Sequence, residues 1–413
     1  RETLSDEPGK DAQQTLATAL NINSQLNDAV IMQTELTRSR SDVEYSYDED
    51  WSFVGIEPAL EYSTFDQYLR DYERDSVDLR LLSGSDGRIF GNSTDWVAGI
   101  YAMQRNEDLT RNYSGSTSAF SSELQSSSVA GYGELTININ ETLRLIYGLR
   151  VENWINQYSD SADIVGETDE TLFGSKSTLE ALLSYDHLAY VSLARGYKAG
   201  GINTDPDISE NNREFDTEFN NTIEIGLKSS LLNNDLTTRI AAFYIERKDQ
   251  QVKSSYAVLD DNGQPESFQD YLANAAEGRN YGFEIEADWN LTERINWELS
   301  YGYLITEFVD YTYQIIDDDE IQEVSKDGRA QAHAPQYTAA TAVNYDLTPA
   351  VSLRVGAEAK DEFYFSDSHD EKSDAYILWN ARIAYAQPGY EVSVYGRNLT
   401  DRDTQVRGFG GFG

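Results

Sequence analysis

Residues 280–289 read NYGFEIEADW and alternate strictly between polar and apolar side chains. The odd-numbered positions carry aromatic and aliphatic groups, and the even-numbered positions carry amide, glycine and carboxylate groups. Residues 351–360 (VSLRVGAEAK) and 143–152 (LRLIYGLRVE) follow the same two-residue period. Because successive side chains of a β-strand point to opposite faces, each segment predicts a strand with one hydrocarbon face and one charged face.

These segments have the length and pattern of membrane-crossing strands. About ten residues with an apolar outside and a wet inside are what a transmembrane β-barrel requires of each strand. The chain has no run of 18 apolar residues, so a transmembrane helix is not expected. The sequence therefore predicts an all-β protein built as an antiparallel transmembrane β-barrel.

The composition excludes several classes of function. Thirty-two lysines and arginines against 72 aspartates and glutamates give the 413-residue chain a formal net charge of −40. This excludes a protein that binds nucleic acid by neutralising phosphates. Cysteine is absent, and neither His187 nor His333 has a partner at metal-ligand spacing. His369 stands beside Asp367 and Asp370 as a weak candidate for a metal or ligand contact, but a solvated loop is the favoured interpretation. We therefore expect no catalytic residues, no enzymatic activity, no metal centre and no cofactor.

About sixteen strands are expected, separated alternately by short and long connections. The expected spans are 13–22, 28–46, 71–83, 95–106, 128–139, 142–156, 178–186, 188–196, 218–230, 235–248, 279–290, 295–309, 337–346, 351–361, 376–386 and 389–398. Asn, Asp, Pro and Gly in the short joints are typical turn residues. Short turns on one side and long polar loops on the other are typical of outer-membrane barrels, whose long loops face outside.

Five segments in order along the chain resemble TonB-dependent outer-membrane receptors of the siderophore or iron-complex type. They are residues 95–101 (DWVAGIY), 146–150 (IYGLR), 194–203 (ARGYKAGGIN), 224–228 (EIGLK) and 395–401 (YGRNLTD). Each match alone is weak, but their order over roughly 310 residues makes the resemblance strong.

The resemblance implies a 22-strand barrel, in which residues 1–413 supply about strands 6 to 21. Because a barrel must close in lipid, a closing strand is expected after Gly413. The N-terminal plug domain and the TonB box of the family have no counterpart in this sequence. We therefore expect a partial barrel domain, whose contact with TonB and its inner-membrane energising complex would be made through that missing N-terminal region.

The expected function is energised import of a scarce ligand, such as a ferric siderophore, across the outer membrane of a Gram-negative bacterium. The substrate class is left open among siderophore, haem, cobalamin and glycan. A passive porin-type channel is the alternative, and a soluble β-structured adhesin is a third reading that the apolar stripes disfavour. The expected partners are the small ligand and outer-membrane lipid, and no nucleic acid.

Ligand recognition is expected in the longest outer loops, residues 197–217, 249–278 and 310–336, because long loops on a rigid scaffold carry recognition. They hold aromatic side chains able to stack on a ligand and basic side chains able to offset the acidic field. The candidates are Tyr256, Tyr271, Tyr311, Tyr313, Lys198 and Arg213. On the strands, charged residues such as Glu286, Arg354 and Arg382 are expected to contact a plug or to line a channel.

Overall fold

The computed structural model describes residues 4–7, 9–56, 63–205, 207–259, 265–317, 320–367 and 370–408. Contacts divide the chain into two compact units. Unit 1 comprises residues 1–135, 148–174 and 199–215, and unit 2 comprises residues 136–147, 175–198 and 216–413. No helix in the described ranges is long and apolar enough to span a membrane.

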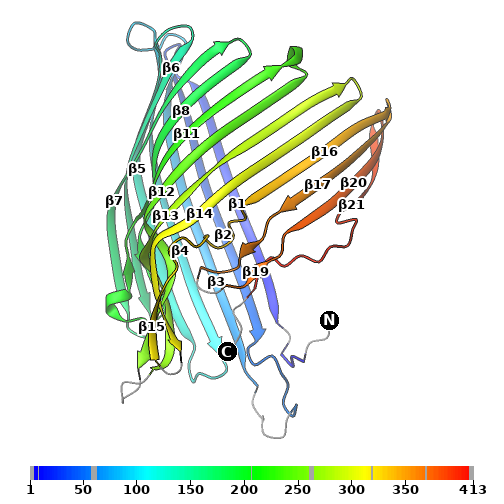
Figure 1. Ribbon diagram of the computed structural model, residues 1–413. Coiled ribbons are helices and arrows are strands. Elements are labelled where there is room, and N and C mark those ends of the chain that lie inside the picture. The colour runs from blue at the N-terminus through cyan, green and yellow to red at the C-terminus, as the bar shows by residue number, and fades with distance from the viewer. Residues whose placement is uncertain are drawn as a thin grey trace. The chain divides into compact units, whose positions relative to one another are not determined.

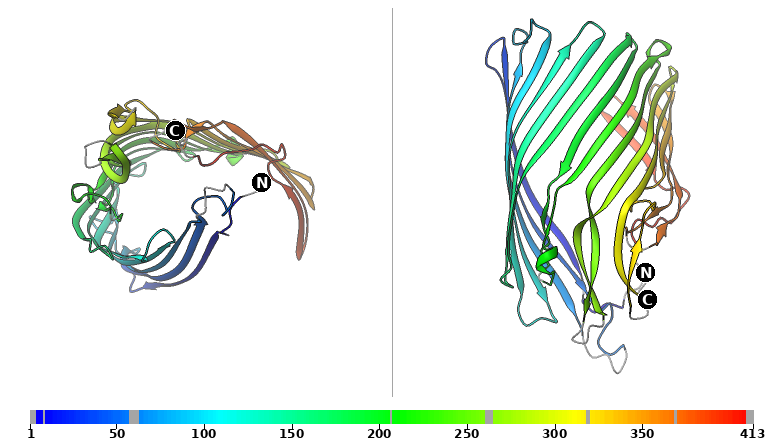
Figure 2. Two further views of the ribbon diagram at one scale, coloured as in Figure 1. Left: turned by 90° about the horizontal axis from the view of Figure 1, so that it is seen from below. Right: turned by 60° about the vertical axis from the view of Figure 1, so that its left-hand side comes forward.

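Unit 1 is built from long antiparallel strands that lie side by side (Figure 2). Its strands are β1 (Lys10–Gln25), β2 (Val30–Asp48), β3 (Phe65–Ser83), β4 (Thr94–Tyr113), most of β5 (Phe120–Asn138), parts of β6 (Leu143–Asp160) and β7 (Val165–Ser184), and the short β9 (Gly201–Ile202) and β10 (Glu214–Phe215). A 3-10 turn, η1 (Glu210–Asn212), precedes β10.

Unit 2 contains the remaining strands, which also pair antiparallel in the order of the chain (Figure 1). The long ones are β8 (His187–Lys198), β11 (Glu218–Leu231), β12 (Leu236–Leu259), β13 (Pro265–Thr292), β14 (Ile295–Asp317), β16 (Tyr337–Thr348), β17 (Val351–Lys360), β20 (Tyr376–Gln387) and β21 (Tyr390–Gly396). The short ones are β15 (Glu320–Ser325), β18 (Phe363–Tyr364) and β19 (Lys372–Ser373), and η2 (Leu232–Asn234) is a 3-10 turn.

The sixteen expected strands correspond to the sixteen strands of seven or more residues in the described structure. Their turn-side ends agree with the prediction to within a few residues. The side chains in the turns explain this agreement. The Asn27 carboxamide oxygen accepts hydrogen bonds from the backbone N–H groups of Ala29 and Val30 at 2.8 and 2.9 Å. The Asn140 oxygen accepts from Thr142 and Leu143 at 2.8 Å each, the local bonding that favours Asn in turns.

On the loop side, the strands were predicted to end too early. Residues 249–278 were expected to form a loop, but β12 and β13 remain paired as far as Leu259 and Pro265. Residues 310–336 likewise contain the end of β14 and all of β15. The apolar alternation stops before backbone pairing ends. The hydrophobic pattern therefore marks only the part of a strand that has one apolar face, and not its whole length.

One face of unit 2 carries an apolar band that ends in the same cross-strand row in neighbouring strands. The cross-strand row Leu193–Ile223–Tyr244–Tyr281–Ile305 is the last apolar row on the loop side. The next row on the same face is Arg195–Asn221–Glu246–Arg279–Glu307. We call this the apolar face of unit 2, and the opposite one its polar face.

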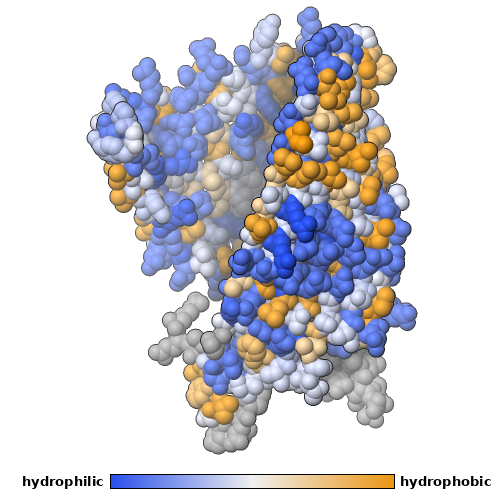
Figure 3. All heavy atoms as spheres, turned by 180° about the vertical axis from the view of Figure 1, so that it is seen from behind, coloured by the Kyte–Doolittle hydropathy of each residue, from blue (hydrophilic) through white to orange (hydrophobic). Residues whose placement is uncertain are grey.

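Along the strands of unit 1, one face likewise changes from apolar to polar side chains. The row Leu20–Leu36–Val77–Ala102 is followed on the loop side by the row Thr18–Arg38–Asp75–Gln104. In the space-filling view, hydrophobic residues gather in one area and hydrophilic residues in an adjoining one (Figure 3). Leu16 and Leu20 expose 73% and 55% of their surface. Exposed apolar side chains in such numbers need an apolar environment to cover them.

Candidate functional site

The six predicted ligand residues are spread over four strands and one loop segment. Tyr256 and Tyr271 lie on β12 and β13, where Tyr271 pairs with Ser254. Tyr313 lies on β14 and pairs with Val324 of β15. The side chains of Tyr256 and Tyr313 are outside the described part of the structure, whereas Tyr271 is half-buried.

Tyr311 is completely buried, so its side chain is covered by the protein in this structure. It packs against Val252 and Phe308, and its ring centroid lies 4.7 Å from that of Phe308. Its hydroxyl donates to the Lys253 carbonyl at 2.9 Å, and its backbone N–H donates to the Asp327 carboxylate at 3.0 Å. These contacts hold the segment that follows β15 against β14.

Arg213 is also buried, with 8% of its surface exposed, and it binds its own chain segment in unit 1. Its guanidinium donates to the carbonyls of Asn203, at 2.9 Å, and of Asp205 and Ile208. In the same unit the Tyr158 hydroxyl donates to the Thr204 carbonyl at 2.8 Å. Arg213 thus holds Asn203, Asp205 and Ile208 together from within.

Tyr158, which donates the hydrogen bond to Thr204, is itself buried. Tyr158 is 2% exposed and lies far along β6 from the turn side, beyond the apolar band. Burial, followed by the hydrogen bond that its hydroxyl donates to Asp160, raises the pKa of Tyr158 above the ordinary tyrosine range. The hydroxyl therefore stays protonated and remains a hydrogen-bond donor at every physiological pH.

Lys198 lies at the loop end of β8, on the polar face of unit 2, and is exposed. It pairs in register with Glu218 of β11, which is 2% exposed. Arg247 of β12 donates to the Glu218 carboxylate through Nε at 2.8 Å and Nη2 at 2.7 Å. A further Arg247 nitrogen donates to the Gln331 carboxamide at 3.0 Å. A buried charge pair thus joins β11 and β12 to the segment before β16.

A second group of residues was not predicted from the sequence. It lies in the segment before β16 and in β17, β18 and β19. The Arg329 guanidinium lies 3.9 Å from the ring centroid of Tyr364, and Lys372 Nζ lies 4.4 Å from the same centroid. Lys360 Nζ lies 4.9 Å from the centroid of Phe363. We call these five residues the basic–aromatic cluster. Cations over aromatic faces are stabilised by the ring quadrupole.

The charges in the cluster are partly balanced. Arg329 Nε lies 3.3 Å from the Asp370 carboxylate, and Lys372 donates to Glu362 at 2.8 Å. That hydrogen bond from Lys372 raises the pKa of the ammonium group. Lys360 has no ion pair within the described ranges. Only 8% of the Arg329 side chain and 4% of Phe363 are exposed, whereas Lys372 is exposed and Lys360 and Tyr364 are half-buried. The exposed part of the cluster can therefore offer cationic groups beside one tyrosine ring to a ligand that carries both a ring and negative charge.

This cluster was not predictable from the sequence because its members are far apart in the chain. Arg329 precedes β16, Lys360 ends β17, and Tyr364 and Lys372 lie in the small β18–β19 hairpin. The backbone brings them together, since the His333 N–H donates to the Tyr364 carbonyl at 2.9 Å. His369, weighed as a metal contact from the sequence, lies outside the described residues. Within the described ranges no three His, Asp or Glu side chains form a metal-binding group.

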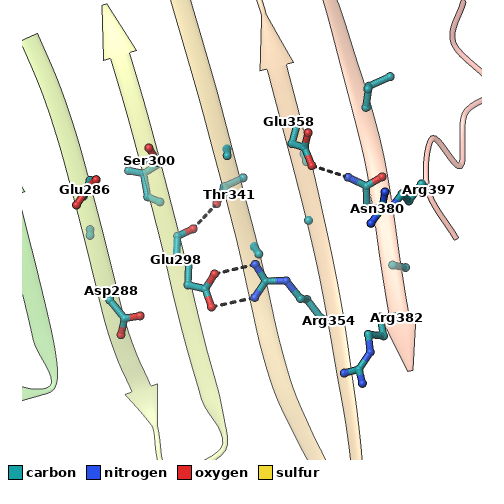
Figure 4. A pocket seen from close by; sticks show the side chains of 18 of the residues that line it. Glu286, Asp288, Glu298, Ser300, Thr341, Arg354, Glu358, Asn380, Arg382 and Arg397 are labelled. Atoms are coloured by element: carbon teal, nitrogen blue, oxygen red, sulfur yellow. Dashed lines mark hydrogen bonds and ion pairs between the residues drawn. The ribbon is translucent and has the colours of Figure 1, made fainter. Parts of the chain in front are cut away.

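Nearer the turns, the polar face of unit 2 forms a groove of about 1190 Å³ (Figure 4). Arg354 of β17 donates two hydrogen bonds to Glu298 of β14, at 2.8 and 2.7 Å. Asn380 of β20 donates to Glu358 at 3.0 Å. The groove also contains alanine and glycine, which leave space between the charged groups. The groove presents fixed charges and open hydrogen-bonding groups to whatever faces it.

Glu286 and Arg382, predicted to share this face with Arg354, are both in the groove lining. Glu286 pairs with Arg239 of β12 at 3.0 Å, and Arg382 pairs with Glu391 of β21. The alternation of side chains therefore assigned these charged residues to the correct face. What they contact beyond each other stays a prediction.

The family described as TonB dependent receptor-like, β-barrel, matches residues 2–399. The pesticin receptor of Yersinia pestis is 24% identical over 353 residues, which cover 82% of this chain and 48% of that protein. The probable TonB-dependent siderophore receptor PiuA of Acinetobacter baumannii is 23% identical over 208 residues, covering 50% of this chain and 26% of that protein. The chain spans about half the length of the pesticin receptor, and less of PiuA.

Two solved structures share the fold over almost the whole chain. The ferric yersiniabactin uptake receptor FyuA from Yersinia pestis superposes with a TM-score of 0.76 at 19% identity, covering 97% of this chain and 58% of that one. The siderophore receptor PiuA from Acinetobacter baumannii gives a TM-score of 0.78 at 18% identity, covering 97% and 62%. At such identities the likeness establishes the fold.

Proposed function

The chain belongs to the TonB dependent receptor-like β-barrel family, and from this premise we propose that it serves energised import of a small ligand across the outer membrane. Proteins of this family are outer-membrane β-barrels that act as receptors and transporters and not as enzymes. The observation that carries the proposal is the match over residues 2–399, together with the apolar band on the sheet. The family match also favours an importer over a passive porin.

We propose that the apolar face lies in lipid and that the loop ends of the strands lie outside the cell. The band fits this placement because in five neighbouring strands an apolar row is followed directly by a row of charged and amide side chains, as at the edge of the apolar belt of such barrels. The assignment of the sixteen long strands to strands 6 to 21 of a 22-strand barrel is part of the same proposal. It is supported by matches that cover 97% of this chain but only 58% and 62% of the two related structures.

The proposed ligand is an iron complex such as a ferric siderophore. Several related structures are receptors for such complexes, among them ferric yersiniabactin, ferric preacinetobactin and ferric citrate. The basic–aromatic cluster supports this choice, because many ferric chelates carry negative charge and many contain aromatic rings. Lys198 and Tyr271 stay candidates for direct contact, and Tyr311 and Arg213 are proposed to position the segments around the ligand.

We further propose that the polar-face groove receives a plug domain and that TonB supplies energy through a segment outside this chain. Paired charges beside small residues suit a protein partner that packs on the groove and can be released from it. Such contacts are modest in strength, since exposed ion pairs contribute about 0–1 kcal/mol each. That modest strength fits a plug that must move during transport.

The test is uptake of radiolabelled iron complexes by cells that carry or lack the receptor. Ferric yersiniabactin, ferric preacinetobactin, ferric citrate and a ferric catecholate form the panel. The proposal expects uptake of at least one complex that requires both the receptor and TonB. Uptake that persists without TonB would support the porin reading, and no receptor-dependent uptake of any complex would overturn the iron assignment.

Variants then test the proposed recognition surface. Tyr364→Ala and Lys360→Gln should raise the concentration needed for half-maximal uptake about tenfold, the loss expected from about 1.4 kcal/mol of cation–π and charge contacts. Lys248→Gln is the matched control, because Lys248 is an exposed cation of unit 2 on the apolar face. An equal effect of all three substitutions would show that the cluster has no special role.

A further inference from the structure

Arg195 of β8 is the first charged residue beyond the apolar band on its strand. It lies on the apolar face of unit 2, two residues after Leu193 and four after Val191. Its cross-strand neighbours are Ser175 of β7 and Asn221 of β11. The side chain is exposed. On the turn side of Arg195, the same face of the sheet carries aliphatic and aromatic side chains.

The level of Arg195 matches the edge of a bilayer. Eight residues separate it from His187, the turn-side end of β8. At about 3.3 Å per residue they span about 26 Å along the strand, and a tilt of about 40° reduces this to about 20 Å of height. The apolar band of such barrels is about 25 Å tall. The guanidinium at the end of its long side chain therefore reaches the level of the lipid headgroups.

Arg195 differs from the other cations on the apolar face of unit 2 at this level. Lys248 lies 3.6 Å from Glu246, and Arg279 lies 3.9 Å from Glu307. Within the described ranges, Arg195 has neither an ion pair nor a hydrogen-bond acceptor. It lies 4.3 Å over the ring of Phe219 instead. Stacking fixes the plane of the guanidinium and leaves its N–H groups available for an external acceptor.

A groove of about 460 Å³ lies beside Arg195 on the sheet. Its walls include the exposed apolar residues Leu193 and Ile223 and the rings of Tyr147 and Tyr244. The Asn221 side chain lies next to Arg195 at the polar end. The groove thus has a hydrocarbon part toward the middle of the strands and a polar part at the level of the headgroups. Arg195, Asn221 and Glu246 line the polar part, and the Glu246 carboxylate lies 3.6 Å from Lys248.

We propose that this groove binds one phosphate-bearing lipid of the surrounding membrane. The phosphate would accept hydrogen bonds from Arg195, and an acyl chain would lie along Leu193, Ile223 and Tyr244. The charge argues for a lipid anion: in a chain of net charge −40, an unpaired arginine is a local exception that can attract a phosphate. The apolar walls argue against a soluble anion, which would gain nothing from them. The proposal rests on the placement of the apolar face in lipid, which is part of the proposed function.

The test titrates lipids onto the receptor, purified from its own outer membrane in a neutral detergent, and counts bound lipids by native mass spectrometry. The probes are phosphatidylglycerol and phosphatidylcholine with identical acyl chains. The proposal expects a preference of about fivefold for phosphatidylglycerol, the effect of one basic residue near an anionic headgroup. Arg195→Gln should abolish this preference, because it weakens binding of the anionic phosphatidylglycerol more than binding of the zwitterionic phosphatidylcholine.

Arg279→Gln is the matched control, because Arg279 occupies the same row of the same face but is paired with Glu307. This variant should keep the preference, as should Arg195→Lys, which retains the charge. An unchanged preference in Arg195→Gln would overturn the proposal, as would equal loss in both glutamine variants. If millimolar inorganic phosphate competed with phosphatidylglycerol for the groove, the ligand would be a soluble anion and the lipid proposal would be overturned. Failure of both lipids to bind would instead count against the membrane placement itself.

Discussion

Glu298 and Arg354 join two strands that are not neighbours. Glu298 lies on β14 and Arg354 on β17, and β16 runs between them. Two parallel hydrogen bonds of 2.7 and 2.8 Å connect the carboxylate with the guanidinium. Asn344 of β16 completes the bridge, since it donates to Glu298 at 2.7 Å and accepts from Arg354 at 2.8 Å. Three strands of the polar face are thus linked through one charged pair.

The first prediction separates stability from transport at this bridge. Both side chains are almost half-exposed, so Arg354→Ala should lower the free energy of unfolding by no more than about 1 kcal/mol. If the groove receives a plug, the same substitution should reduce TonB-dependent uptake severalfold. Urea unfolding in detergent measures the first quantity, and iron uptake by cells measures the second.

A control on the same face isolates the effect of position. Arg239→Ala removes another exposed, ion-paired arginine from the groove lining, with its partner Glu286 at 3.0 Å. It should be equally mild for stability. If Arg354→Ala lowered unfolding free energy by several kcal/mol, the bridge would be a structural element and not a contact surface.

The second prediction concerns the apolar face. Ile285 lies on this face between Ile240 of β12 and Tyr301 of β14. Its replacement by Arg should cost about 2–4 kcal/mol in a bilayer, because the charge would be placed in hydrocarbon. Replacement of Leu353 or Leu149 by Arg should have a similar cost. Refolding into lipid vesicles, followed by denaturant titration, gives these costs.

The neighbouring residue provides the comparison. Glu286 follows Ile285 directly and lies on the polar face, where it pairs with Arg239. Glu286→Arg should therefore cost much less than Ile285→Arg. Equal costs at the two positions would contradict the assignment of the two faces.

Most of the strand pattern was predictable because one face of the sheet is apolar and the other polar, which gives the sequence a period of two. At Phe283, Ile285 and Trp289 the period of two is unbroken, and the structure places these side chains on one face. The loop-side extensions were not predictable, because beyond the band neither face must be apolar. Residues 265–278 of β13 carry no alternation, yet they pair with β12 through backbone bonds.

The candidate site was predictable only in part for a related reason. Tyr311 and Arg213 have the residue types of ligand contacts, but their burial depends on long-range packing that local sequence does not encode. The basic–aromatic cluster joins Arg329 with Tyr364, which lie in different loop segments. No spacing rule links such positions.

The third prediction concerns the buried pair Glu218 and Arg247. Their side chains are 2% and 24% exposed. Glu218→Ala should destabilise the protein by about 3 kcal/mol or more, because it leaves a largely buried guanidinium without its carboxylate. The double variant Glu218→Leu with Arg247→Leu should cost far less than the sum of the two single changes. Denaturant titration of all variants completes the cycle, and strict additivity would show that the two charges do not depend on each other.

The fourth prediction concerns Arg213, which holds residues 203–208 by hydrogen bonds to three backbone carbonyls. Arg213→Met keeps much of the volume but leaves these carbonyls without their donor, at about 1–3 kcal/mol for each group that stays buried. We expect the segment to open, so that protease cleavage within residues 199–215 becomes at least tenfold faster. Arg213→Lys should rescue this poorly, since one ammonium cannot reproduce the planar array of donors. Lys198→Met is the control, because Lys198 is exposed and should leave the cleavage rate unchanged. If Arg213 instead contacted the ligand directly, Arg213→Met would weaken ligand binding without any change in cleavage, and the clamp would be the wrong interpretation.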